Sequence, residues 1–537
     1  MRRRATYVTH PSRAVDPADI QVRPKQLLLG GLKAAREERL TYGLEELPAE
    51  LAHHLRQCHE LHMRWAPERP YNTTAPFLSR SSPGLHVQYT PLNETQPDRL
   101  CDLLHRLFGK HLKCDSPNAT FISPPLISER FAQMSSLQYY SGLPSLKYLV
   151  AYIYRTSCAP DDLQCLHTVS LLNIADSVDA DYDSISHALT FTVLWSKQPP
   201  VFYDPIGDFT TLDAWNLDVQ AKGDDRVEVG ILSAGKATEP SDLQLSGFLT
   251  VVGEDDRPKA TLFSFPSRHH SLNQEQSREQ KYAVSFDRPT GLHPTLRISF
   301  PSASSLVEPA DKPADSVCAL QTYLTLPSYI FADKYAFLSN DPLFQNSHHL
   351  GQLHSIAGET DLEAPDYVVQ KWGSTMLLSI QTPNNHTLGG TGTKSSSRES
   401  WDITIPLHLR YLNPNNNGTS EVDVPWPIVF WACTADDGTK FPVNPFDRTQ
   451  LGFDGLFGPR TMFYHLDPAP NAASAGRLVE RISIPVLNLE ATSSWSIEML
   501  TVVAIALGFL WVLVKLMPAL WPRPATDKDA SGSKKKQ

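Results

Sequence analysis

MLTVVAIALGFLWVLV, residues 499–514, decides how this chain is organised, because sixteen successive positions carry no charged side chain. Beyond Lys515 the apolar character continues to residue 521. A helix rises about 1.5 Å per residue, so a segment of this length can cross the hydrocarbon core of a bilayer, which is about 30 Å thick. The long stem of Lys515 allows its ammonium group to reach the headgroups at one end. The sequence therefore predicts one transmembrane helix at 499–521, preceded by a large polar portion.

The charges on the two sides of this segment predict its orientation. Six Lys or Arg residues follow residue 514, whereas only Arg477 and Arg481 lie within roughly twenty residues before the segment. Excess positive charge marks the cytoplasmic side, so residues 1–498 are expected in the lumen and 522–537 as a basic cytosolic tail. The tail carries Lys534 and Lys535 at the fourth and third positions from its end, which resembles a dilysine signal for retrieval to the endoplasmic reticulum. A generic basic stop-transfer tail is the alternative.

Sequons for N-glycosylation give a second indication of topology. About three would arise by chance in a chain of this composition, and the sequence has five. This mild excess favours the lumen together with the charge asymmetry. The start of the chain, MRRRATYVTH, has no apolar segment after its positive charges, so no secretory signal peptide is predicted and a cytosolic, tail-anchored body remains an alternative. The expected glycosylation sites are Asn72, Asn93, Asn118, Asn385 and Asn417.

The composition favours a mainly β fold. Proline outnumbers glycine, 43 to 27, and short runs of β-branched and aromatic residues lie between the breaks. The net charge of −10 is dispersed and no basic stripe interleaves with aromatics, so a nucleic-acid partner is not expected. Within residues 1–175, the stretches 47–65 and 97–112 have helical spacing. The expected organisation is a mixed N-terminal region at 1–175, a sandwich-like β-rich domain at 176–302, a linker at 303–317, a second β-rich domain at 318–468 and a juxtamembrane spacer at 469–498.

The seven cysteines indicate disulfides rather than a metal site. None of them forms a CXXC pair, which disfavours a zinc ribbon or a thioredoxin-like site. In an oxidising lumen, pairs such as Cys158–Cys165 or Cys318–Cys433 are compatible with the sequence, and the odd count leaves at least one thiol. The connectivity cannot be deduced from spacing.

The motifs that could carry catalysis are weak. The acidic stretch DADYD (179–183) matches the triplet with which some sugar-nucleotide transferases hold a metal, but such triplets are common in polar loops. HELH (59–62) lacks the histidine spacing of a zinc metalloprotease and is expected on the polar face of a helix. The histidine pairs at 269–270 and 348–349 are expected in exposed loops, and GGTGTK (389–394) in a flexible loop. We therefore predict no catalytic, metal or cofactor site.

Four strings in the C-terminal half carry a family resemblance. LPSYIFADKY (326–335), DLEAP (361–365), PLHLRYLNP (406–414) and VPWPIVFWAC (424–433) occur in this order before the apolar segment. Together they resemble the PIG-X family, whose longer fungal members are the protease-B-nonderepressible type. The resemblance covers about residues 318–521, and the long N-terminal extension is similar to that of the fungal members.

This resemblance implies a non-catalytic subunit of glycosylphosphatidylinositol (GPI) mannosyltransferase I in the endoplasmic reticulum membrane. The implied partner is a polytopic, PIG-M-type enzyme, which the subunit stabilises and which adds the first mannose to the GPI precursor. Fungal members are also linked to the folding of other luminal proteins. Two alternatives remain: a hydrolase or transferase with an unrecognised site in the N-terminal half, and a cytosolic tail-anchored adaptor.

Several residues of the motifs and the anchor are candidates for contact with a partner. In ITIPLHLRY (403–411), alternation places the apolar residues and Tyr411 on one face and Thr404, His408 and Arg410 on the other. For His408 and Arg410 the alternative to a partner contact is a polar face of the sheet that is satisfied within the chain. Aromatic residues next to two prolines suit an edge strand, although core packing is the alternative. Ala504 and Gly508, four residues apart, share one face of the anchor helix and allow close approach of another helix. The candidates are His408, Arg410, Trp426, Trp431, Ala504 and Gly508.

Overall fold

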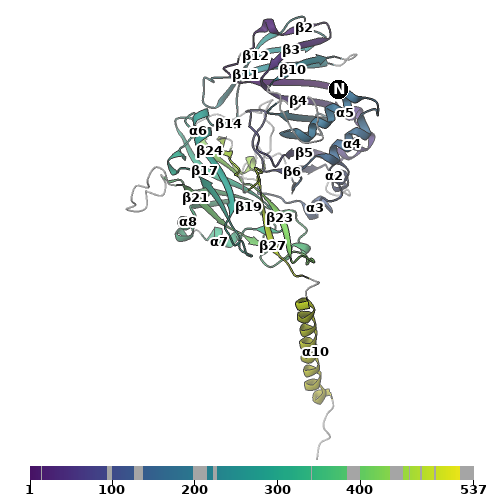
Figure 1. The fold of residues 1–537 in the computed structure, drawn as a ribbon, viewed down its shortest axis with the longest axis vertical. Coiled ribbons are helices and arrows are strands. Elements are labelled where there is room, and N and C mark those ends of the chain that lie inside the picture. The colour runs from purple at the N-terminus through teal and green to yellow at the C-terminus, as the bar shows by residue number, and fades with distance from the viewer. Residues whose placement is uncertain are drawn as a thin grey trace, which may run out of the picture. The chain divides into compact units, whose positions relative to one another are not determined.

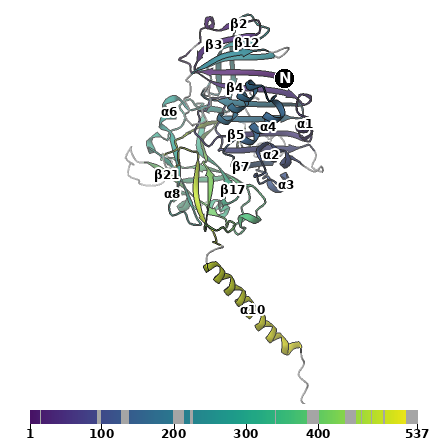
Figure 2. The ribbon, with the colours of Figure 1, turned by 45° about the vertical axis from the view of Figure 1, so that its right-hand side comes forward.

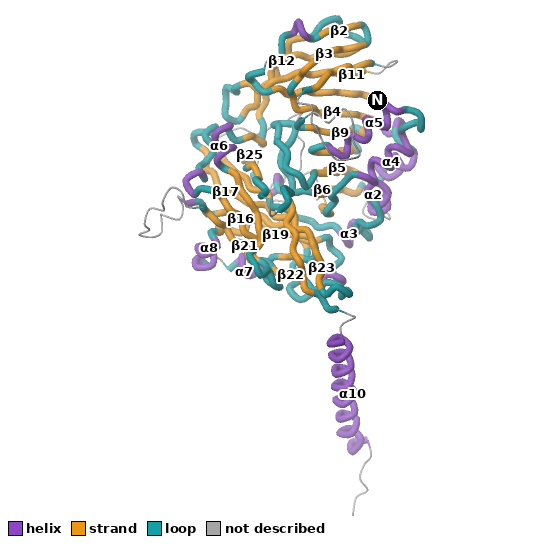
Figure 3. Tube along the Cα trace, viewed as in Figure 1, coloured by secondary structure: helices purple, strands orange, loops and turns teal. Residues whose placement is uncertain are grey.

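The computed structural model of this protein is mostly β, with one long apolar helix near the C-terminus (Figures 1 and 3). It forms two units: Met1–Tyr411 with Glu421–Ile482, called the body below, and Leu412–Ser420 with Ser483–Gln537. The described residues are 1–13, 15–92, 99–125, 137–197, 214–221, 226–339, 341–383, 400–435, 452–458, 460–471, 474–488 and 492–520.

The largest element of the body is a ten-stranded sheet in which the first strand of the chain lies in the interior. β1 pairs in parallel with β11 on one side and antiparallel with β4 on the other. In order across the sheet the strands are β13 (Lys259–Pro266), β12 (Asp242–Val252), β11 (Arg226–Gly235), β1 (Arg2–Thr9), β4 (Ala34–Gly43), β9 (Ala188–Trp195), β8 (Ser177–Asp183), β5 (Cys58–Ala66), β6 (Gly84–Pro91) and β7 (Leu137–Ser141).

Helices cover one face of this sheet, as Figure 2 shows. They are α1 (Ala49–Leu55), α2 (Leu100–Phe108), α4 (Lys147–Ser157) and α5 (Leu163–Ser170). α2 buries six of its nine side chains because its leucines recur at helical spacing. Two disulfides fix the segments around these helices, Cys101–Cys114 and Cys158–Cys165. A short helix and a small sheet complete this half: α3 (Pro117–Thr120), β2 (Gln21–Arg23), β3 (Gln26–Leu32) and β10 (Trp215–Gln220).

The other half of the body contains a six-stranded and a four-stranded sheet. The strand order of the six-stranded sheet is β14 (His269–Ser271), β25 (Thr461–His465), β24 (Ile428–Ala435), β17 (Ser316–Pro327), β20 (Gly373–Ile380) and β19 (Leu350–Gly358). The strand order of the four-stranded sheet is β21 (Trp401–Pro406), β16 (Thr295–Phe300), β15 (Lys281–Phe286) and β26 (Asp467–Pro468). The disulfide Cys318–Cys433 joins directly opposed residues of β17 and β24.

Smaller elements connect these sheets. Two strands, β23 (Thr419–Pro425) and β27 (Val479–Pro485), extend into the second unit, and β18 (Ile330–Phe331) pairs with β22 (His408–Leu409). The short helices are α6 (Gln274–Glu279), α7 (Lys334–Leu338), α8 (Pro342–His348), η1 (Pro17–Asp19), η2 (Leu44–Glu46), η3 (Leu171–Ile174), η4 (Ala303–Ser305), η5 (Asp366–Val368) and η6 (Asp454–Leu456).

The strands cross the domain boundaries expected from the sequence. Five strands of the ten-stranded sheet lie before residue 175 (β1, β4, β5, β6 and β7), and the other five lie after it (β8, β9, β11, β12 and β13). β14, β15 and β16 precede the expected linker but belong to the two C-terminal sheets. Whether any of the expected regions folds independently remains a prediction.

One expected helix is largely a strand. The helix expected at 47–65 ends at Leu55 in α1, and β5 begins at Cys58. In β5 the side chains of Leu61, Met63 and Trp65 are buried, whereas His62 and Arg64 alternate with them. The period of two in LHMRW, rather than the helical spacing that precedes it, is the signal that identifies this strand.

The second unit contains the anchor helix α10 (Thr492–Leu520). Its apolar portion, Trp495–Met517, has a mean hydropathy of 2.4 and is 23 residues long. Every side chain in that portion is exposed in the isolated chain. These features confirm the expected helix of membrane-spanning length, the one such helix within the described parts of the chain, and place its start before residue 499.

Candidate functional site

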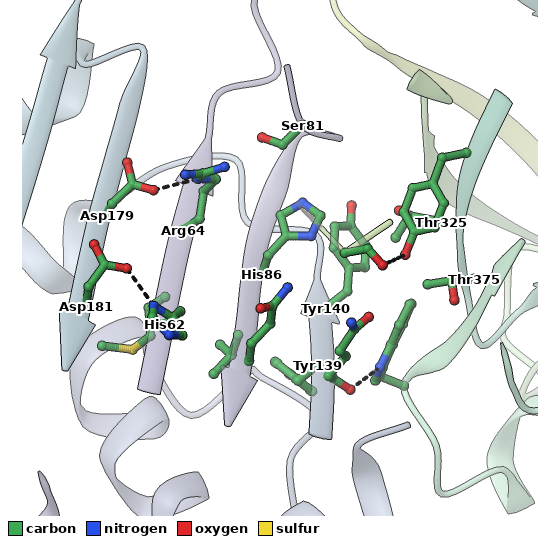
Figure 4. A pocket seen from close by; sticks show the side chains of 17 residues that line it. His62, Arg64, Ser81, His86, Tyr139, Tyr140, Asp179, Asp181, Thr325 and Thr375 are labelled. Carbon is green, nitrogen blue, oxygen red and sulfur yellow. Dashed lines mark hydrogen bonds and ion pairs between the residues drawn. The ribbon is translucent and has the colours of Figure 1, made fainter. Parts of the chain in front are cut away.

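A charged pocket lies in the body where β5 and β8 run side by side (Figure 4). Their antiparallel register sets His62 opposite Asp181 and Arg64 opposite Asp179. The alternation of β5 sends these polar side chains to one face of the sheet and Met63 and its apolar neighbours to the other. The acidic stretch noticed in the sequence therefore meets two basic residues more than a hundred positions away.

Each carboxylate in the pocket is paired with a basic side chain. The Arg64 Nε donates to Asp179 Oδ1 at 2.5 Å, and the Ser177 hydroxyl donates to Asp179 Oδ2 at 2.6 Å. His62 Nδ1 lies 2.9 Å from Asp181 Oδ1. Burial alone would lower the pKa of His62, but its hydrogen bond to Asp181 and the charge of that carboxylate together raise the pKa above its ordinary value. These ion pairs leave the carboxylates poorly available as metal ligands.

The far wall of the pocket comes from the C-terminal half of the body. Thr325 of β17 and Thr375 of β20 line the pocket opposite His86 of β6 (Figure 4). Thr325 Oγ1 lies 3.1 Å from Ser82 Oγ. Burial lowers the pKa of His86 to about 4, although its Nε2 lies 2.7 Å from the Ser82 carbonyl oxygen. The enclosed volume is about 40 Å³, enough for only a few water molecules.

This geometry suits a polar seam between the two halves better than a catalytic centre. A sugar or a nucleotide would not fit the enclosed space. Within the described parts of the chain, no three His, Cys, Asp or Glu side chains are arranged to hold a metal ion. The seam continues outside the pocket, where Arg80 pairs with Asp467 at 2.5 Å and Arg477 with Glu68 at 3.2 Å.

The histidine pairs expected in exposed loops are in fact packed in the body. His269 and His270 belong to β14 and are 4% and 8% exposed. His269 Nε2 lies 3.3 Å from Asp454 Oδ2, and the ring of His270 stacks on Tyr464. His349 stacks on Trp401 with ring centroids 4.0 Å apart. Partners distant in sequence, which local composition does not reveal, explain the difference.

The candidate partner contacts fall into two groups. Trp426 and Trp431 are each 3% exposed, and their indole N–H groups donate to Glu480 and Gln280, respectively. Arg410 is 2% exposed, and its Nη1 donates to the carbonyl oxygens of Asp361 at 2.6 Å and Ala364 at 2.7 Å. These three side chains pack inside the body, which favours the packing alternative that the sequence left open. His408 is only partly buried, so it stays a candidate contact.

In ITIPLHLRY, the predicted alternation of buried and exposed side chains is correct up to Leu409, and the pattern is reversed at the two residues that follow. Ile403, Ile405, Leu407 and Leu409 are all buried, but Tyr411 is 65% exposed. The strand β22 ends at Leu409, so the alternation no longer applies to Arg410 and Tyr411.

The remaining predicted sites lie on the surface or outside the described residues. Asn72, Asn118 and Asn417 are exposed, as a glycan requires. In α10, Ala504 and Gly508 are exposed, and a side chain added at Gly508 would meet no atom of this chain within 4 Å. Asn93, Asn385, Lys534, Lys535 and the GGTGTK loop lie outside the described residues.

The cysteines form three disulfides, two of which are the pairs named from the sequence. The third, Cys101–Cys114, joins α2 to the segment that follows it and was not anticipated, because spacing alone does not fix connectivity. The seventh cysteine, Cys58, is a buried thiol whose Sγ lies 3.4 Å from the His54 carbonyl oxygen.

Comparisons with known proteins give a consistent result. A family model described as PIG-X / PBN1 matches residues 289–517. "Protein pbn1" of Aspergillus oryzae is 46% identical over 572 residues, covering 100% of both chains. "Protein pbn1" of Emericella nidulans is 47% identical over 96% of this chain and 95% of its own, and that of Neurospora crassa is 36% identical over 97% and 96%. The similarity thus includes the ten-stranded sheet, which precedes the residues matched by the family model.

Proposed function

The chain belongs to the PIG-X / PBN1 family, and on that premise we propose that it is a non-catalytic, stabilising subunit of GPI mannosyltransferase I in the endoplasmic reticulum membrane. The observation that carries the proposal is the identity of 46% over the whole length of a pbn1 protein. The partner would be the polytopic PIG-M-type catalytic subunit that adds the first mannose to the GPI precursor. Support for the folding or stability of other membrane-bound or luminal proteins is a further part of this proposal.

The anchor and the pocket are compatible with an accessory role. A lipid-linked sugar donor requires a reaction site at the membrane, and one helix in the described chain is long and apolar enough to cross it. The charged groups of the pocket in the body are engaged with one another rather than directed at an open space. We propose that the polytopic partner supplies the catalytic residues.

We also propose that the body lies in the lumen and the basic tail in the cytosol. Three disulfides support this orientation, because disulfides persist in oxidising compartments. The exposed sequons at Asn72, Asn118 and Asn417 and the basic residues after the anchor agree with it. Lys534 and Lys535 would then serve as a retrieval signal on the cytosolic side.

Rapid depletion of the protein tests the stabilising role. The half-life of an epitope-tagged catalytic subunit and the mannosylated GPI precursor are measured at the same time points. A stabiliser predicts that the partner's half-life shortens before the product falls, and that extra copies of the partner partly restore the product. Loss of product with normal partner abundance would contradict the proposal and indicate an enzyme.

Sealed microsomes test the topology separately. With a luminal body, added protease removes only the tail after α10, and a glycosidase increases the mobility of the protein on a gel. The triple variant Asn72→Gln, Asn118→Gln and Asn417→Gln provides the control, since its mobility shift should shrink. Digestion of the body in intact vesicles would indicate the cytosolic adaptor instead.

A further inference from the structure

A large cavity lies between the helix-covered face of the ten-stranded sheet and the helices themselves. Its volume is about 830 Å³, and we call it the helix-side chamber. Its floor is formed by β4, β5, β6, β8 and β9, which direct side chains such as Trp65, Ala180 and Val193 toward the helices. Its roof is formed by α1, α2, α4 and α5. All of these elements belong to the body and precede the residues matched by the family model.

The walls of the chamber are apolar because their polar atoms have partners elsewhere. The indole N–H of Trp65 donates to the Leu143 carbonyl at 2.8 Å, and that of Trp195 donates to the Leu171 carbonyl at 3.2 Å. Both rings therefore present only their apolar surface to the chamber. The one buried carboxylate of the lining, Glu38, is bound by Arg36 and by Arg3, whose Nε lies 2.6 Å from Glu38 Oε1.

Four polar residues of the lining are at exposed positions and mark the mouth of the chamber: Glu46 before α1, Thr156 and Ser157 at the end of α4, and Thr168 of α5. The apolar lining residues other than Met1 are buried or partly buried. The site thus combines an apolar interior with a polar rim. This distribution matches an amphiphile with a hydrocarbon part inside and a polar group at the surface.

The roof is held in place without a ligand. α4 and α5 are joined by the disulfide Cys158–Cys165, and Cys165 itself lines the chamber. The Tyr154 hydroxyl of α4 donates to the Leu166 carbonyl of α5 at 3.0 Å. These links keep the two helices together above the sheet, so the chamber is preformed.

The volume of the chamber and its apolar walls indicate which kind of ligand it can bind. The chamber is partly open to solvent, and its volume of about 830 Å³ is in the range of known small-molecule sites. Water inside would find few hydrogen-bond partners on such walls. A polypeptide segment would bring backbone N–H and C=O groups that the walls could not satisfy, whereas a hydrocarbon chain has none. We propose that the helix-side chamber binds the hydrocarbon chain of a membrane lipid, since the same chain carries a helix of membrane-spanning length.

Photocrosslinking of the full-length protein in lipid nanodiscs tests this site. The probe is a palmitate analogue with a photoreactive group on its chain, and labelled peptides are identified by mass spectrometry. We expect saturable labelling of residues in α4, α5 and β9, which unlabelled palmitate competes away. Labelling confined to α10, or labelling that palmitate does not compete, would overturn the proposal.

Two variants with side chains that fill the chamber provide a second test of the site in the same photocrosslinking experiment. Val193→Trp adds an indole that points from β9 into the space, and Ala180→Phe does the same from β8. Each should lower saturable labelling by about tenfold. The control Ala151→Trp adds the same indole at an exposed position of α4 that does not line the chamber, and its labelling should match the wild type.

The labelling experiment can be interpreted even if one of the variants fails to fold. Thermal unfolding of each variant shows whether its body is intact, and Ala180→Phe decides the question if Val193→Trp does not fold. Undiminished labelling in a folded variant contradicts the proposal, as does an apolar peptide that binds and is not displaced by palmitate. The inference rests on the chamber and the anchor, so it stands or falls independently of the mannosyltransferase partner.

Discussion

Arg410 illustrates how a residue of the family motif stabilises the body. Its guanidinium lies over the Phe331 ring, 4.1 Å from the centroid, while Nη1 donates to two carbonyl oxygens. Burial lowers its pKa. A planar group with several donors can make all of these contacts at once, and a lysine ammonium cannot.

Arg410→Lys should therefore reduce stability rather than partner binding alone. We expect the free energy of unfolding to fall by about 2 kcal/mol, because one carbonyl loses its donor and the ring contact is lost. Thermal unfolding of the purified protein measures the change. Arg257→Lys, at an exposed position, is the control. Normal stability combined with weaker recovery of the catalytic subunit would instead assign Arg410 to a partner contact.

His270 makes the stability of the body sensitive to acid. It is 8% exposed, and burial lowers its pKa from 6.5 to about 4, although its Nε2 lies 2.7 Å from the Ser267 carbonyl oxygen. Between these two values the unfolded chain binds a proton that the folded body does not. Stability is therefore lost as the pH falls from 6.5 toward 4.

His270→Gln should weaken this dependence while keeping a hydrogen-bond donor. At 1.36 kcal/mol per pKa unit, His270 contributes up to about 3 kcal/mol to the loss of stability over this range. Denaturant unfolding at several pH values between 4 and 7 measures the slope for both proteins. The same slope in the variant and in the wild type would show that His270 is not buried in its neutral form.

At the scale of elements, the spacing of apolar residues along the sequence predicted those helices and strands that are determined by nearby residues. The apolar run of α10, the leucine spacing of α2 and the alternation of residues 403–409 were all recognisable in the sequence. The strand β5 was not, because the helical spacing around α1 continued into it and its partner residues in β8 lie more than a hundred positions away. The pairing of Arg64 with Asp179 is likewise set by sheet register, which local composition does not encode.

The anchor helix offers a test of recognition within the membrane. A Cβ added at Gly508 meets no neighbouring atom within 4 Å among the described residues, so Gly508→Leu should leave the body unchanged. If Ala504 and Gly508 form the contact face, the larger side chain blocks close helix approach and lowers recovery of the catalytic subunit several-fold. Co-purification in detergent measures this. Ala506→Leu, about 200° around the helix from Gly508, is the matched control, and equal recovery for both variants would remove the anchor contact.

At the scale of the whole molecule, the family-matched residues do not form a complete structure. The match begins at residue 289, but β14 and β15 lie before it and pair with β25 and with β16 and β26. Gln280 accepts the indole N–H of Trp431 at 2.9 Å, and the Tyr282 hydroxyl donates to the Pro427 carbonyl at 2.9 Å. The segment before the match thus completes the core of the C-terminal sheets.

A fragment that starts at residue 289 should consequently be less stable than one that starts at 267. It would expose the edges of β25 and β16 and leave the Trp431 indole without its acceptor, so we expect aggregation. Size-exclusion chromatography of the two fragments, each ending before α10, compares them directly. A monomeric, cooperatively unfolding 289 fragment would show that β14 and β15 are dispensable.

The position of β1 inside the ten-stranded sheet has a consequence for biogenesis. Arg4 of β1 contacts Glu228 of β11, 224 residues later in the chain. At about 5–20 residues per second, a ribosome takes roughly 10 to 45 s to deliver the second strand after the first. During that interval the first strand has one open edge while the nascent chain lengthens. The opening residues of this polypeptide are thus a natural client for a cotranslational chaperone, well before the anchor has been synthesised.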